Sequence, residues 1–372
     1  MTSFPGRLAL QQRVLAAYRA PFFDFLAQAC VGGLSVCAGK PMPQESIATA
    51  DSLQVAQYHP VRNIHLFRGP WLLCYQRGLT GWLDEWDPDV LITEINPRTI
   101  STAKALHWMK NRTKPVIGWG LGSPSPASFP GFLKRTGEKW IKSKLRSYLA
   151  RFDALLTYSD RGAEEYASLG FPAERIFAAP NAATPPPGHP MPLRPGQFNN
   201  KPTILFVGRL QARKKVDLLL NACAALPLAL QPRLVIVGDG PEYASLVALA
   251  KQVYPGTEFP GARHGTDLLP WFLEADLFVL PGTGGLAVQE AMSYGLPIIM
   301  GTGDGTNDNL VRPSNGWQFS EPDQLTGILQ KALSDIPGLR ERGAASYDIV
   351  AREINLVTMR EGFLRALHTV GA

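Results

Sequence analysis

Glycine and basic residues follow a short apolar run in the second half of the chain. Gly208 and Arg209 come directly after residues 203–207, and Lys214 lies a few positions further on. A glycine at a strand end lets the backbone approach a ligand closely. Arginine presents a planar fork to phosphate oxygens, and lysine adds a mobile ammonium group. These residues are able to hold a diphosphate, although a glycine turn beside two surface cations would have the same sequence.

A glycine-rich segment, residues 281–285, follows another apolar run and opens a predicted helix at Leu286. The free N–H groups at the start of a helix bind phosphate, and the helix dipole assists them. Glu290 lies about one turn further along, among small apolar neighbours, where a carboxylate usually has a donor partner. The hydroxyl groups of a ligand are one candidate for that donor, and a structural hydrogen bond is the other.

Short apolar runs alternate with helical patterns through both halves of the chain. In the second half, the predicted strands are 203–207, 234–237, 277–280 and 297–300, and the predicted helices are 216–226, 243–252 and 286–294. In the first half, the predicted strands are 89–93, 115–118 and 154–159, and the predicted helices are 99–110, 132–151 and 163–169. This alternation is typical of a parallel sheet covered on both faces, and ligands of such sheets bind outside the carboxyl ends of the strands.

Prolines concentrate just after the middle of the chain and exclude a helix or a central strand there. We expect an exposed linker at 189–200, between one Rossmann-like domain at 1–188 and another at 201–347. The two domains are expected to face each other across a cleft. The last residues, 348–372, are predicted to form a helix that packs back towards the first domain.

The composition is that of a globular protein. The chain has 372 residues, of which 45% are hydrophobic and 18% are charged, which excludes global disorder and a coiled coil. No apolar run is long enough for a membrane-spanning helix, and the first residues do not have the pattern of a secretory signal. The 4 cysteines form no metal-ligand cluster, so we expect buried free thiols in a reducing cytoplasm.

Taken in order, the segments of the second half resemble the donor domain of the retaining glycosyltransferases of family 4, the glycosyl transferases group 1, which have the GT-B fold. The resemblance is carried by Gly208-Arg209-Leu210, Lys214 with Asp217, Gly238-Asp239-Gly240-Pro241, Phe259-Pro260-Gly261, 275–281, Gly284-Gly285-Leu286, Glu290-Ala291-Met292 and Gly295-Leu296-Pro297-Ile298. The turn at 238–241 lacks the third glycine of a dinucleotide fingerprint, so by itself it indicates a structural turn. The ordered set is much more specific than any one of its parts.

The resemblance implies a role for each matching position. Arg209 and Lys214 would hold the diphosphate of a nucleotide-sugar and neutralise the charge that develops as the leaving group departs. Glu290 would accept hydrogen bonds from the ribose hydroxyls. The remaining expected donor-binding residues are Gly208, Gly238, Gly261, Arg263, Thr283, Gly284, Gly285 and Leu286, with Gly261 and Arg263 bordering the base. These fixed cations and helix-start amides supply positive charge without a metal ion, so no cofactor is expected.

Two departures from the family's pattern stand out. The family usually has two glutamates eight positions apart; the second is Glu290, but the first falls on Gly282. Many relatives also place a histidine after a strand of the first domain, whereas the comparable run here is 118–122, without histidine. His107 falls on a predicted helix and is interpreted as a surface or packing residue. Glu94, at a strand end with Arg98 nearby, remains a candidate base or hydroxyl ligand, or else a capping residue.

The sequence therefore predicts a cytoplasmic, retaining glycosyltransferase that moves a sugar to a lipid-linked or growing surface glycan. The alternatives are a catalytically silent nucleotide-sugar binding module, suggested by Gly282, and a GT-B-type epimerase or polymer synthase. A basic stretch at 134–151 predicts a helix face that binds the anionic inner face of the membrane peripherally. That face comprises Arg135, Lys139, Lys142 and Arg146. No nucleic-acid motif is found.

Overall fold

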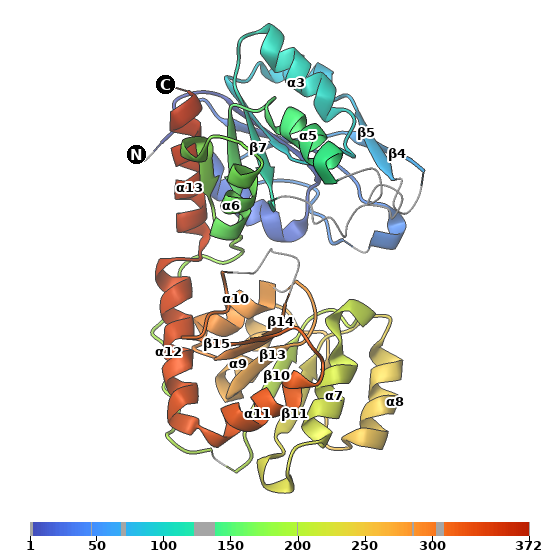
Figure 1. The fold of residues 1–372 in the computed structure, drawn as a ribbon, viewed down its shortest axis with the longest axis vertical. Helices are drawn as coiled ribbons and strands as arrows, with labels where there is room; N and C mark the ends of the chain where they lie inside the picture. The colour runs from blue at the N-terminus through green and yellow to red at the C-terminus, as the bar shows by residue number, and fades with distance from the viewer. Residues whose placement is uncertain are drawn as a thin grey trace. The chain divides into compact units, whose positions relative to one another are not determined.

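The computed structural model divides the chain into two compact units (Figure 1). It describes residues 3–45, 47–67, 72–122, 138–198, 200–284, 286–302 and 309–371. The first unit is Met1–Ala183 together with Leu356–Ala372, and the second is Thr184–Asn355. The chain thus passes between the units twice, and its last helix belongs to the first unit.

The first unit is built on a parallel sheet with strand order β3-β2-β1-β6-β7-β8-β9. Its strands are β1 Leu8–Val14, β2 Leu34–Gly39, β3 Gln57–Pro60, β6 Val90–Glu94, β7 Val116–Gly120, β8 Ala154–Thr157 and β9 Ile176–Ala178. A separate antiparallel hairpin consists of β4 Arg62–Leu66 and β5 Leu73–Arg77. The sequence did not predict β1, β2 or the hairpin.

Helices cover this sheet with two separate hydrophobic cores. One core includes apolar residues of α1 Ala20–Ala27 and α13 Leu356–Val370, where the Phe363 ring packs edge-on against Phe22 with centroids 4.9 Å apart. The other core includes residues of α2 Leu79–Trp86, α3 Thr102–Asn111 and α5 Glu138–Leu149. A further helix, α6, spans Asp160–Ser168.

The second unit contains a six-stranded parallel sheet with order β12-β11-β10-β13-β14-β15. Its strands are β10 Thr203–Val207, β11 Arg233–Val237, β12 Glu258–Gly261, β13 Leu277–Leu280, β14 Ile298–Gly301 and β15 Gly316–Phe319. Its helices are α7 Val216–Ala224, α8 Tyr243–Val253, α9 Leu269–Glu274, α10 Leu286–Ser293, α11 Gln324–Ser334 and α12 Ile336–Arg352. The predicted α/β class, with two Rossmann-like domains, is confirmed.

In both sheets the strand order reverses between the first strand and the fourth. The reversal lies between β1 and β6 in the first unit and between β10 and β13 in the second. At such a point the chain segments that follow the two adjacent strands run in opposite directions, which leaves a crevice outside the carboxyl ends of the strands. The Gly208 and Pro281–Gly284 segments directly follow the two strands at the reversal of the second unit.

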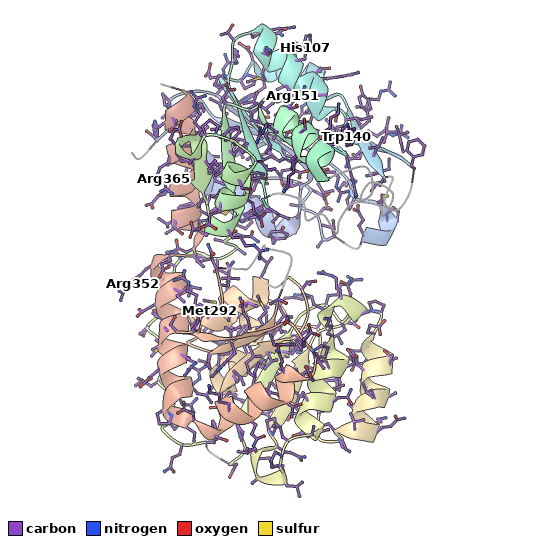
Figure 2. All side chains as sticks on the ribbon, in the orientation of Figure 1. His107, Trp140, Arg151, Met292, Arg352 and Arg365 are labelled. Carbon is purple, nitrogen blue, oxygen red and sulfur yellow. The ribbon has the colours of Figure 1, made fainter. Side chains whose placement is uncertain are left out.

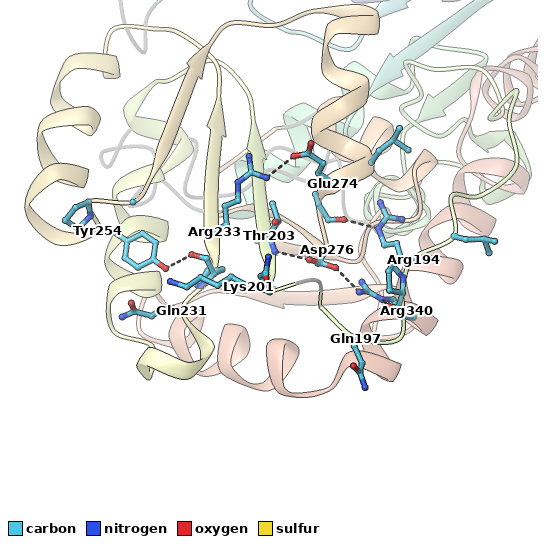
Figure 3. Close-up of a pocket in the computed structure, with 18 of the residues that line it drawn as sticks. Arg194, Gln197, Lys201, Thr203, Gln231, Arg233, Tyr254, Glu274, Asp276 and Arg340 are labelled. Carbon is cyan, nitrogen blue, oxygen red and sulfur yellow. Dashed lines mark hydrogen bonds and ion pairs between the residues drawn. The ribbon is translucent and has the colours of Figure 1, made fainter.

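The proline-rich segment 189–198 is exposed or half-buried, but it belongs to the second unit and does not lie between the two units. Arg194, within it, donates to the carbonyl oxygen of Ala275 at 2.9 Å (Figure 3). It also donates to the carbonyl oxygens of Phe272 at 2.9 Å and Tyr294 at 2.6 Å. These carbonyls lie near the ends of α9 and α10, where helical carbonyls have no partner within the helix. One guanidinium therefore fixes 189–198 to the second unit, and the boundary lies at Ala183–Thr184.

The expected C-terminal helix is also divided differently. Residues up to Arg352 continue α12 of the second unit, whereas α13 packs against α1, β8 and β9 of the first. Other expectations hold: all 4 cysteines are buried free thiols, and His107 lies exposed on α3 (Figure 2). Among the described residues, the helices are too short or too polar to cross a bilayer.

Candidate functional site

The neighbouring strands β10, β11 and β12 of the second sheet each have a glycine at the carboxyl end, namely Gly208, Gly238 and Gly261, and backbone hydrogen bonds join these three strand ends. The Gly208 N–H donates to Val237 O and the Gly238 N–H to Gly261 O, each at 3.0 Å. Gly238 has φ of +153°, and a Cβ on it would overlap the carbonyl oxygen of Gly208. Gly238 therefore lets two strand-end loops pack backbone against backbone. These contacts show a structural role for Gly238.

Lys214 joins the loop after β10 to the loop after β13. It lies in the short 3-10 helix Ala212–Lys214, is buried, and its Nζ donates to the carbonyls of Thr283 at 2.8 Å and Gly284 at 3.3 Å. The Thr283 N–H donates in return to Arg213 O at 3.2 Å. The two loops flanking the reversal of strand order thus hold a positive charge between them.

Gly282 explains why the first glutamate of the family pattern is absent. A Cβ at this position would lie 2.5 Å from Lys214 Cα and would overlap Arg213 O. No side chain fits unless the Arg213–Lys214 turn moves. The two loops can approach each other this closely only because residue 282 has no side chain, and therefore no carboxylate.

Glu290 lies within α10, whose first residue is Leu286. Its side chain is half-buried, and among the described residues its carboxylate has no hydrogen-bond partner. Burial raises the pKa of Glu290 above its ordinary value. A carboxylate that is partly removed from water without a donor lowers stability, so Glu290 stays a candidate acceptor for hydrogen bonds from a ligand.

Side-chain hydrogen bonds do not join the other expected donor-binding residues to one another within the described part of the chain. Arg209 is exposed and makes no side-chain bond within the described part of the chain. Arg263 is exposed too and donates only to its neighbour's carbonyl, Ala262 O, at 3.2 Å. Gly285 lies outside the described residues.

Two family models match the chain. One, described as glycosyl transferases group 1, matches residues 201–335, and the other, described as glycosyltransferase family 4, matches residues 35–185. The chain belongs to the family 4 glycosyltransferases. The two matches fall on different units, so the resemblance noted for the second half extends to the first.

Two relatives and one solved structure illustrate the similarity. A GDP-mannose-dependent alpha-mannosyltransferase of Mycobacterium tuberculosis is 39% identical over 143 residues, 36% of this chain and 36% of that protein. A GDP-mannose-dependent monoacylated alpha-(1-6)-phosphatidylinositol monomannoside mannosyltransferase of Corynebacterium glutamicum is 30% identical over 188 residues, 47% of this chain and 49% of that protein. The chain spans less than half the length of these relatives. The apo lipopolysaccharide outer core galactosyltransferase WaaB, 16% identical, covers 98% of this chain and 99% of its own with a TM-score of 0.70, which confirms the GT-B fold.

In the first unit, Glu94 ends β6 beside the reversal of strand order. Its carboxylate accepts a hydrogen bond from the Arg13 N–H at 3.0 Å, and burial raises its pKa. The Arg13 guanidinium is bound instead to Glu45, at 2.8 Å. Trp119 lies near the position where relatives have histidine; it is buried and packs against Phe23 and Tyr158. Arg98 is exposed.

A buried polar network fills the same edge, and the sequence did not predict it. Gln11 donates to the side chain of Gln76 and accepts from Thr93, while Gln76 donates to Gln12 O at 3.0 Å. Gln76 belongs to the hairpin, so β5 covers the end of β1. The signal was present, because the polar residues Gln11, Gln12 and Arg13 interrupt an otherwise apolar run at 8–15.

The predicted membrane face of α5 is only partly described. Arg135 lies outside the described residues, and so does the side chain of Lys139. Lys142 is exposed, but Arg146 donates from Nε to Leu169 O at 2.8 Å, so it caps the end of α6. Trp140 is exposed on the same helix (Figure 2).

A cavity of about 880 Å³ lies at the opposite edge of the second sheet (Figure 3). Arg233 is paired there with Glu258 and Glu274, and Arg340 is paired with Asp276 at 2.8 Å. Because these charges satisfy one another, the cavity offers a ligand few free groups.

One Asp-x-Asp run, Asp87–Asp89, occurs in the sequence and precedes β6. Asp87 pairs with Lys114 at 2.5 Å, and Asp89 accepts from the Arg7 N–H at 2.7 Å. Both carboxylates therefore already have partners, and they lie at the amino-terminal edge of the sheet, away from the carboxyl ends of the strands. Within the described residues, no three side chains of histidine, cysteine, aspartate or glutamate lie close enough together to bind a metal ion.

Proposed function

We propose that this glycosyltransferase moves a sugar from a nucleoside diphosphate-sugar to an acceptor with retention of anomeric configuration. The observation that carries the proposal is the buried ammonium group of Lys214, held by the carbonyls of Thr283 and Gly284 at the reversal of strand order. Arg209, exposed beside it in sequence, supplies a second cation. The names of the relatives support a donor of this class, since both are GDP-mannose-dependent.

These cations stabilise the reacting groups most strongly while the bond between the sugar and the diphosphate breaks. Negative charge then builds on the diphosphate while the sugar becomes oxocarbenium-like. Cations and helix-start N–H groups that are already in place stabilise that charge without reorganisation. Leu286 opens the helix whose N–H groups would serve this purpose, and Glu290 would hold the ribose hydroxyls through charge-assisted bonds. Gly208, Gly261 and Arg263 would line the nucleotide, and no divalent metal is required.

We further propose that the first unit binds the acceptor. Glu94 is the candidate base or hydroxyl ligand, because it is a carboxylate at a strand end whose pKa burial raises, so it takes up a proton more readily than an ordinary glutamate. A lipid-linked or growing surface glycan fits the second relative, whose name specifies a phosphatidylinositol mannoside acceptor. Such an acceptor lies in a membrane, so peripheral attachment to an anionic leaflet at its cytoplasmic face is part of the proposal.

Single substitutions test the transfer step. Arg209→Ala and Lys214→Ala should each lower turnover by on the order of 10²-fold or more, because each removes a charge that acts mainly in the transition state. Release of nucleoside diphosphate, with donor and acceptor present, is the measurement, and it should persist in EDTA. Lys251→Ala on α8 removes an exposed cation elsewhere and is the control.

Near wild-type turnover in both variants would show the assignment to be wrong. Gly282 favours a second candidate, a silent binding module, because the carboxylate that contacts the sugar in the family is missing. Donor binding without any release of nucleoside diphosphate would select that candidate over a transferase.

A further inference from the structure

The β4–β5 hairpin turns its polar face inward. Asn63 pairs with Gln76, and His65 with Cys74, so these four side chains share one face. From that face Asn63 donates to Arg13 O at 2.7 Å and to Lys40 O at 2.9 Å. Sheets that face water on one side normally bury their apolar side chains and expose the polar ones. This hairpin does the reverse.

The outer face of the hairpin is consequently apolar. Ile64 pairs with Tyr75 and Leu66 with Leu73, and alternation puts all four on the face opposite Asn63. Leu66 is 40% exposed, and Phe67, directly after it, is 70% exposed. None of these residues joins the hydrophobic clusters formed by the described residues. Figure 1 shows the hairpin at the margin of the first unit.

Basic side chains lie at the other end of the same outer face. Arg62 and Arg77 are directly opposite each other in the hairpin and both are exposed. Like charges in such a pair repel, and within the described residues neither guanidinium has an acidic partner. Lys104 of α3 adds a third cation, with its Nζ 5.0 Å from the centre of the Tyr75 ring.

The sequence around this face contains no compensating acid. No aspartate or glutamate occurs between Asp51 and Asp84, nor between Glu94 and Glu138. These stretches include the whole hairpin and all of α3. An apolar end, a cationic end and the absence of carboxylates complement a surface that is itself apolar inside and anionic outside.

We propose that the outer face of the β4–β5 hairpin docks on an anionic phospholipid bilayer. Leu66 and Phe67 enter the boundary of the acyl chains, while Arg62 and Arg77 meet the lipid phosphates. The strand from Arg62 to Leu66 spans about 13 Å. This length exceeds the roughly 5–10 Å to which peripheral elements sink, so an inclined strand brings Leu66 to the acyl boundary while Arg62 stays at the phosphates. This inference rests on the proposed membrane attachment and deepens it, because it names an element other than α5.

Vesicle sedimentation separates the inference from the broader proposal. The wild type should sediment with phosphatidylglycerol vesicles at low salt and much less with phosphatidylcholine vesicles. The double variant Leu66→Glu with Phe67→Glu should bind at least on the order of tenfold more weakly, because it puts carboxylates where acyl chains should be. Val31→Glu, an equally exposed apolar position of the same unit, should bind like the wild type.

Each outcome has a meaning. If the wild type does not sediment, both the attachment and the hairpin assignment fail. If it sediments and the double variant sediments equally, only the hairpin assignment fails, and loss of binding in Lys142→Glu with Lys144→Glu would return the role to α5. If the wild type is a dimer by size-exclusion chromatography and the double variant is a monomer, the face is an interface between copies and the proposal is overturned.

A fluorescent probe gives a readout independent of charge. Because all 4 native cysteines are buried, Leu66→Cys can be labelled selectively with an environment-sensitive dye. Emission should rise and shift to the blue with phosphatidylglycerol vesicles, whereas the same label at Val31→Cys should not respond. An unchanged spectrum at residue 66 in vesicle-bound protein would overturn the proposal.

Discussion

The two sheets share a strand order, yet their carboxyl edges are built from different residues. In the second unit, the strands at the reversal end in Gly208 and in the glycine-rich loop around Gly282, and Lys214 lies between those loops. In the first unit, Gln11 and Gln76 occupy the part of the corresponding edge at β1, under the hairpin, beside Glu94 at the end of β6. The shared topology provides a crevice, and the side chains decide whether it stays open to a ligand.

The comparison also separates two uses of buried polar groups. Gln76 in the first unit is satisfied by the chain itself, through side chains and the Gln12 carbonyl. Glu290 in the second unit is half-buried and has no such partner within the described residues. Satisfied networks stabilise a fold, whereas an unsatisfied carboxylate lowers its stability until a ligand binds. We therefore expect substitutions at the two edges to affect stability and ligand binding differently.

The largest effect is expected where the two loops of the second unit touch. Gly282→Glu restores the carboxylate of the family pattern but forces a side chain into the Arg213–Lys214 turn. We expect a loss of on the order of 3 kcal/mol in the free energy of unfolding, together with loss of nucleotide binding and no gain in turnover. Urea unfolding and titration calorimetry measure these quantities. Gly256→Glu is the control, because open space surrounds that glycine. Improved turnover in Gly282→Glu would contradict the packing argument.

A smaller and purely structural effect is expected in the first unit. Gln76→Leu leaves Gln11 and the Gln12 carbonyl without their partner in a buried site, at a cost of about 2 kcal/mol in the free energy of unfolding. Nucleotide affinity, measured at a temperature where the variant is folded, should not change. Gln57→Leu, on exposed β3, should leave both quantities near wild type. A drop in nucleotide affinity with unchanged stability would reverse the roles assigned to the two edges.

The fold was more predictable in the second unit than in the first for a physical reason. Strands 203–207 and 277–280 were predicted with their observed bounds because both are apolar runs, apart from Thr203 at the start of the first, in a sheet buried on both faces. In contrast, β1 carries Gln11 and Gln12 into the core, and the hairpin inverts the usual alternation, so hydrophobic patterns did not reveal them. The linker was misjudged because prolines signal the absence of helix but not the anchoring of Arg194.

Site residues followed the same rule. The position of the glycine-rich loop around 282, between a strand and a helix, could be predicted from the sequence, whereas its role in binding stays a prediction. The engagement of Lys214 by two carbonyls, and of Arg146 by Leu169, depends on segments far apart in the chain. Sequence patterns specify which groups are available, whereas only the packing of distant segments shows which of them are already engaged.

The smallest and most discriminating effect is expected at Glu290. Because burial raises the pKa of this carboxyl in the folded protein, its ionised form opposes folding, and stability is lost as the pH rises through the folded pKa. Glu290→Gln should thus raise the melting temperature slightly at neutral pH, and this gain should vanish in acid, where the carboxyl is protonated in both states. Nucleotide affinity should nevertheless fall by on the order of tenfold, because a charge-assisted bond to the ribose is lost. Glu341→Gln, exposed on α12, is the control for both measurements. A lower melting temperature with unchanged affinity would mean that Glu290 stabilises the fold like Gln76, and the contrast between the two edges would not hold at this residue.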